Sequence, residues 1–134
     1  MDKSPLVNEQ IAAGGQLIQE VSNSGVFPVQ AAFWLTERDS QEWYLYLASD
    51  HINDSNFDLA YGEVWRVFPR EQAIWLDPFQ VKVLGTDAPV AKAVLELMKK
   101  YPGEIPMRYH GRLLGNLSVD EACIYPISLA VSHE

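Results

Sequence analysis

The chain has little of several residue types that mark common classes of protein. It contains one cysteine, Cys123, and three histidines among 134 residues, so an intramolecular disulfide and a cysteine-rich zinc site are both excluded. A single thiol fits a reducing compartment, and we expect a cytoplasmic protein. No apolar run approaches the roughly 20 residues of a membrane span, and none follows Met1 as a signal peptide would require.

Basic residues are scarce too. Ten Lys and Arg accompany 18 Asp and Glu, which gives a formal net charge of -8. Binding to nucleic acid or to anionic lipid depends on Lys and Arg neutralising phosphates. We therefore expect no nucleic-acid partner and no membrane association, whereas a basic protein partner would suit the charge. Solubility alone explains the acidic balance as well.

The sequence also lacks the short patterns that mark common catalytic and cofactor sites. There is no Gly-x-Ser-x-Gly elbow, no Gly-x-x-x-x-Gly-Lys phosphate loop and no Gly-x-Gly-x-x-Gly. The histidines His51, His110 and His133 are scattered, so we expect no metal and no cofactor. Cys123 lies between apolar neighbours, where a buried thiol is favoured over a reactive one. These absences favour a protein that is not an enzyme.

The apolar residues that are present follow the periods of helices and strands. Helical spacing predicts three helices, over residues 7–24, 57–68 and 90–101. Strands are predicted over residues 29–36 and 43–48, in an interrupted strand over 74–84, and in three short segments between 105 and 125 with turns near Gly111 and Asp120. Adjacent pairs of strands separated by helices favour an antiparallel arrangement. We predict one α+β domain over residues 1–134, with a mainly antiparallel sheet of five to six strands and about three helices in two layers.

An aromatic-rich β-hairpin over residues 29–48 is the sharpest clue to function. An odd number of loop residues would place Trp34, Tyr44 and Tyr46 on one face, whereas an even number would separate Trp34 from the two tyrosines. The odd register is slightly favoured, because it segregates the aliphatic side chains from hydroxyls that need a partner. Neither face is polar in either register. Helices therefore cover both faces, or a second subunit or a ligand completes one of them.

The leading hypothesis is a non-enzymatic binding or protein-interaction module. It would self-associate through a sheet face that carries Trp34, Tyr44 and Tyr46, and so form a homo-oligomer such as a homodimer. Aromatic side chains with polar tips are enriched at such interfaces.

The alternative is a small enzyme or a domain that binds an anionic ligand. Its candidate residues are Asp50 and His51, which precede the second helix, and Arg108 and His110, which alternation places on the same face of one strand. This hypothesis requires the two pairs to converge in one cleft.

Much of the chain resembles a small, uncharacterised bacterial protein family. The shared features are a leading helix, a Gly-Val-Phe-Pro segment at residues 25–28, a strand like residues 31–35, and a tryptophan that opens the next strand, here Trp43. Near the end of the resemblance, an acidic residue and an alanine precede residues 124–125, as they do in that family. The resemblance implies a shared fold and brings no activity, cofactor or catalytic residue. Residues 126–134 extend beyond the expected end of such a protein.

Overall fold

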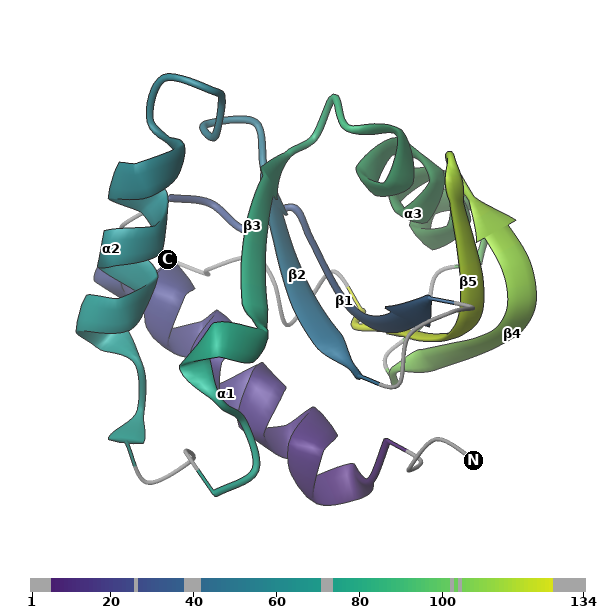
Figure 1. Ribbon diagram of the computed structural model, residues 1–134, viewed down its shortest axis with the longest axis horizontal. Helices are drawn as coiled ribbons and strands as arrows, with labels where there is room; N and C mark the ends of the chain where they lie inside the picture. The colour runs from purple at the N-terminus through teal and green to yellow at the C-terminus, as the bar shows by residue number, and fades with distance from the viewer. Residues whose placement is uncertain are drawn as a thin grey trace.

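A computed structural model of the chain describes residues 6–25, 27–37, 42–70, 74–101, 103 and 105–126. His133 and the C-terminal residues 127–134, whose role the sequence leaves open, lie outside this part. The described elements are α1 (Asn8–Ser24), β1 (Ala31–Glu37), β2 (Tyr44–Ser49), α2 (Phe57–Val67), a short 3₁₀ helix η2 (Pro78–Gln80), β3 (Val81–Gly85), α3 (Pro89–Lys100), β4 (Met107–Leu114) and β5 (Leu117–Ile124) (Figure 1). The predicted α+β class is confirmed. None of these helices is long and apolar enough to cross a membrane.

The described strands form one sheet in the order β3-β2-β1-β5-β4. All neighbouring strands are antiparallel except β2 and β3, which are parallel and are joined by the crossover through α2. The sheet is therefore mixed but mostly antiparallel, as predicted. This order places β3 and β4 at opposite edges.

Helices cover both faces of the sheet, so the domain has three layers instead of the predicted two. The helices α1 and α2 pack on one face, and α3 packs on the other (Figure 1). The reason lies in the hairpin, where six of the seven β1 residues are buried. A strand that is apolar on both sides must be covered on both sides.

The first helix ends where its sequence predicts. Gly25 follows Ser24 with a φ of 73°, a left-handed conformation that glycine adopts without a steric penalty, and its N–H donates to the carbonyl of Ser22. At the other end, the side-chain oxygen of Gln10 accepts a hydrogen bond from the N–H of Val7 at 3.1 Å. Local signals therefore set both ends of α1.

Three of the predicted strand boundaries were wrong. Residues 74 and 75 form a turn and Leu76 belongs to no strand. Asp77 then caps η2 by accepting a hydrogen bond from the N–H of Phe79 at 2.9 Å, with Pro78 in the first helical position. The strand β4 continues through Gly111 and β5 continues through Asp120, so neither predicted turn forms; the turn comes at Gly115, with a φ of 63°. A Cβ on Gly115 would lie 2.4 Å from the carbonyl oxygen of Pro89, so this turn packs closely on the start of α3.

Candidate functional site

The hairpin adopts the register with an even number of loop residues. Leu35 lies opposite Tyr44, Phe33 opposite Tyr46 and Trp34 opposite Leu45. Because opposed residues share a face, Trp34 lies on one side of the sheet and both tyrosines lie on the other. The favoured odd register was wrong. Odd hairpin loops use glycine or asparagine in a left-handed conformation, and neither residue occurs between the two strands.

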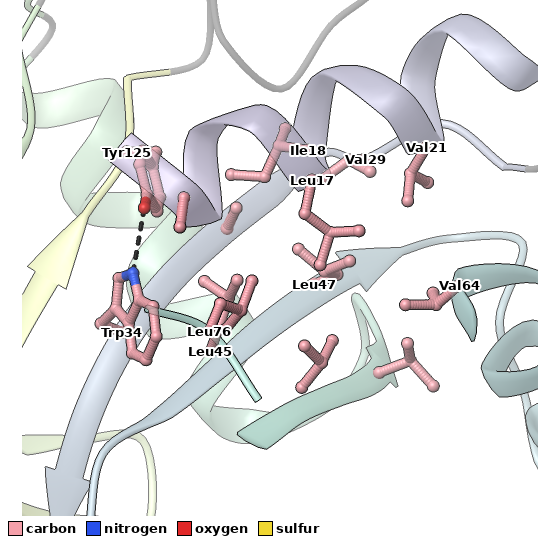
Figure 2. Packing of buried hydrophobic residues seen from close by; sticks show 14 of the residues in the cluster. Leu17, Ile18, Val21, Val29, Trp34, Leu45, Leu47, Val64, Leu76 and Tyr125 are labelled. Carbon is pink, nitrogen blue, oxygen red and sulfur yellow. Dashed lines mark hydrogen bonds between the residues drawn. The ribbon is translucent and has the colours of Figure 1, made fainter. Parts of the chain in front are cut away.

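Trp34 is a core residue and no part of an exposed interface. It is fully buried beneath α1, where its indole N–H donates to the hydroxyl of Tyr125 at 2.9 Å (Figure 2). That hydroxyl donates in turn to the carbonyl of Ile11, and burial raises the pKa of Tyr125. The helix comes this close because position 14 is a glycine, whose missing Cβ would lie 2.3 Å from the Tyr125 hydroxyl.

The tyrosines Tyr44 and Tyr46 lie on the α3 side of the sheet and are half-buried. The ring of Tyr46 stacks on Phe33, with ring centroids 5.3 Å apart and the planes at 7°. Burial and then the charge of Glu37 raise its pKa to about 12. The hydroxyl of Tyr44 donates to Glu42 at 3.1 Å, and the ammonium of Lys82 lies 4.7 Å from the centre of its ring. The three predicted interface residues therefore do not form one surface.

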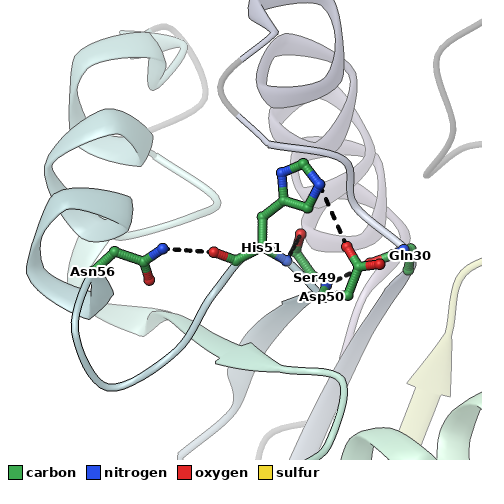
Figure 3. Close-up of polar contacts among 5 residues, drawn as sticks. All are labelled: Gln30, Ser49, Asp50, His51 and Asn56. Carbon is green, nitrogen blue, oxygen red and sulfur yellow. Dashed lines mark hydrogen bonds and ion pairs between the residues drawn. The ribbon is translucent and has the colours of Figure 1, made fainter.

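Asp50 and His51 lie together in the turn after β2, with their side chains exposed (Figure 3). The imidazole Nε2 of His51 lies 3.6 Å from a carboxylate oxygen of Asp50. The shorter contacts of this turn belong to its backbone. The N–H of Asp50 donates to the side chain of Gln30 at 2.6 Å, and the side-chain amide of Asn56 donates to the carbonyl of His51 at 2.6 Å. These bonds hold the connection between β2 and α2.

Arg108 and His110 lie on β4, at the far edge of the sheet. The guanidinium of Arg108 donates to the carbonyl of Leu6 at 3.2 Å, and the imidazole Nδ1 of His110 lies 3.2 Å from a carboxylate oxygen of Glu121. As predicted, both residues lie on one strand, two positions apart.

The strand order keeps the two candidate pairs apart. Two strands lie between β2 and β4, which corresponds to about 14 Å across the sheet at about 4.8 Å per strand. His110 is also level with Thr36, near the closed end of the hairpin, whereas His51 follows β2 at the open end. The structure thus brings Asp50 to His51 but does not form the cleft that the alternative hypothesis requires.

Cys123 occupies the predicted core position, with 1% of its surface exposed. Burial raises the pKa of its thiol, and the charge of Arg108 opposes this shift. Within the described ranges, no group of three or more His, Cys, Asp and Glu side chains could hold a metal ion.

A series of exposed large apolar side chains lies along α2 and the segment that leads into the edge strand β3, and the sequence interpretation missed it. We call it the aromatic surface; its members, with the exposed fraction of each, are Trp65 (48%), Ile74 (80%), Trp75 (42%) and Phe79 (76%). The rings of Trp65 and Phe79 meet edge to face, with centroids 5.1 Å apart. One signal was available, since Trp65 falls outside the apolar stripe of its helix. The predicted strand over residues 74–84 forms only from Val81 onward, and its wrong first part concealed the other members, because a strand would have buried part of them.

Comparisons with known proteins assign neither a family nor a function to the chain. The resemblance to a bacterial family, which rests on residues 7–125, stays a prediction. The candidate site is therefore defined by its own residues, namely the aromatic surface on α2 and on the segment that leads into β3. No family model, curated protein or solved structure matches the chain.

Proposed function

We propose that the chain is a non-enzymatic protein-interaction module that self-associates through the aromatic surface. One observation carries the proposal: four large apolar side chains near the β3 edge are 42 to 80% exposed. Exposed apolar side chains scattered singly are normal, whereas a group of them marks a contact surface. The proposal keeps the predicted class of function but moves its site away from the hairpin.

The size of the aromatic surface suits the centre of a dimer interface. A fully buried aromatic side chain covers about 150 to 250 Å², so the exposed parts of its three aromatic residues amount to roughly 300 Å². This lies at the lower end of the range for the largest apolar patch of a monomer, about 300 to 600 Å², and such patches often take part in binding. Tryptophan is also enriched among the residues that contribute most to binding energy.

A second copy of the chain is the partner that the local chemistry favours. A two-fold interface needs only a patch that is complementary to itself, and an apolar patch meets that need without paired charges. Next to Trp65, the guanidinium of Arg66 lies 2.6 Å from the carboxylate of Glu63, so these two charges offset each other. This ion pair therefore adds no net charge beside Trp65.

Sedimentation of the wild-type chain and of two matched variants would test the proposal. The variant Phe79→Ser should weaken the dimer at least tenfold, because it removes a ring from the interface, while costing the 76% exposed position little folding stability. The control Leu113→Ser changes a similar side chain, 72% exposed, on the opposite edge strand β4 and should leave the dimer intact. A wild-type monomer at every concentration, or equal weakening by both substitutions, would contradict the proposal.

Salt provides an independent check. Because the aromatic surface carries no charge, the dimer should persist or tighten as salt increases. Dissociation by salt would instead indicate an interface built on charge.

A further inference from the structure

A second feature, a pocket of about 350 Å³, lies between the C-terminal half of α3 and the strands β4 and β5. One wall contains Met107 and Ile124, which are opposed across the two strands. The other contains Leu95 and Met98 of α3. The pocket is far from the aromatic surface, since β4 and β3 are opposite edges of the sheet.

The pocket is apolar both inside and at its opening. Tyr101 and Ile105 line it and are themselves exposed, so apolar surface continues from the interior to the solvent. The two methionines in its walls have flexible side chains that adapt to different ligand shapes. A pocket of this size and lining is typical of small-molecule sites, which begin at about 300 Å³.

Lys99 is the one residue with a charged side chain among the described residues that line the pocket. It also lines the neighbouring groove, together with Lys92 and Lys100, where Glu96 is the acidic residue. The chain as a whole is acidic, so this cluster on α3 is a local excess of positive charge.

We propose that the pocket binds an amphipathic anion, an aliphatic chain of about ten carbons whose carboxylate pairs with Lys99. The length follows from the volume, because at about 30 Å³ per water-sized group the pocket holds on the order of a dozen non-hydrogen atoms. The apolar walls bind the aliphatic chain, because each CH₂ group that leaves water for an apolar surface contributes favourable free energy. The ammonium of Lys99 then favours an anionic head over a neutral or cationic one.

Calorimetric titration of the full chain with three ligands of equal chain length tests the head group. The probes are decanoate, decanol and decyltrimethylammonium, each below its micellar concentration. We expect saturable binding of one decanoate per chain, weaker binding of decanol, and the weakest binding of the cation. Absence of saturable decanoate binding, or tighter binding of decanol or of the cation, would overturn the proposal.

A matched pair of substitutions locates the carboxylate. The variant Lys99→Met should weaken decanoate binding about two- to fivefold, as expected for an exposed ion pair, and should leave decanol binding unchanged. The control Lys100→Met removes the adjacent charge, which does not line the pocket, and should change neither affinity. Equal losses in the two variants would show that general charge, and no specific pair, attracts the ligand, and the assignment to Lys99 would be overturned.

A third variant tests whether the aliphatic chain occupies this pocket. Met98→Trp adds bulk to one wall and should abolish binding of both decanoate and decanol, with thermal unfolding confirming that the variant is folded. Unchanged decanoate affinity in the folded variant would place the ligand elsewhere. If the variant does not fold, the comparison of Lys99→Met with Lys100→Met still decides the proposal.

Discussion

The indole N–H of Trp34 donates a hydrogen bond to the hydroxyl of Tyr125 at 2.9 Å, although 91 positions separate the two residues in the chain. Both side chains are buried beneath α1, at the point where Gly14 allows the helix to approach (Figure 2). The hydroxyl of Tyr125 completes the contact by donating to Ile11 of the same helix. This network joins the first helix, the central strand β1 and the residue after β5.

The close approach at Gly14 predicts that Gly14→Ala destabilises the protein by about 1 to 3 kcal/mol, through overpacking of the core. The new Cβ would lie 2.3 Å from the hydroxyl of Tyr125 and 3.0 Å from the indole nitrogen of Trp34. Gly15→Ala is the matched control, because its Cβ would lie 3.8 Å from the ring of Tyr125, an ordinary contact. There, the higher helix propensity of alanine should stabilise the fold by up to about 1 kcal/mol. Urea denaturation measures both effects, and a shift of the same sign in the two variants would contradict the prediction.

The hydrogen bond itself predicts that Tyr125→Phe destabilises the protein by about 1 to 3 kcal/mol, because it leaves the buried indole N–H of Trp34 without an acceptor. Tyr44→Phe removes an exposed hydroxyl that donates to Glu42 and should change stability by less than about 0.5 kcal/mol. In a double-mutant cycle, Trp34→Phe should cost less when Tyr125 is already phenylalanine, since the unpaired donor disappears. Strict additivity of the two substitutions would show that the bond contributes nothing.

Alkaline pH should destabilise the folded state through Tyr46. Burial, together with the charge of Glu37, raises the pKa of Tyr46 from 10.0 to about 12. The unfolded chain therefore loses this proton at lower pH than the folded protein does. The contribution to stability is complete below pH 10 and is lost as the pH rises toward 12. Urea midpoints measured across this window should fall, and they should fall less steeply in Tyr46→Phe; identical slopes would assign the effect to other groups.

Cys123 should resist a mild thiol reagent in the folded protein. It is 1% exposed, and burial raises the pKa of its thiol, so both access and the thiolate fraction are low. Denaturation should release one reactive thiol per chain. Rapid modification of the native protein, followed by absorbance, would mean that β5 opens readily or that the thiol is accessible.

Local sequence determined the helices well. The period of the apolar residues predicted α1, α2 and α3, and Gly25 and Pro69 correctly indicated where the first two end. These signals lie within a few residues of the structure they specify, so they need no knowledge of the rest of the fold. The α+β class followed from the order of helices and strands. The buried position of Cys123 followed from its apolar neighbours.

The candidate site was harder to predict because it depends on pairing and on distant contacts. The parity of one loop decided whether Trp34 shares a face with Tyr46, and a shift of one residue exchanges every side chain of a strand between faces. The sequence correctly placed Asp50 with His51 before the second helix, and Arg108 with His110 on one strand. Only the strand order and register showed that two strands separate the two pairs and that they lie at opposite ends of the sheet.

The sequence by itself thus determined the class of the domain, its helices and the apolar character of both faces of the hairpin. The tertiary structure alone decided that α3 covers the face opposite α1, that Trp34 is buried against Tyr125, and that an aromatic surface remains exposed beside β3. The physical reason is the range of the interactions. Helix periodicity and caps act over a few residues, whereas burial depends on which distant segments pack together.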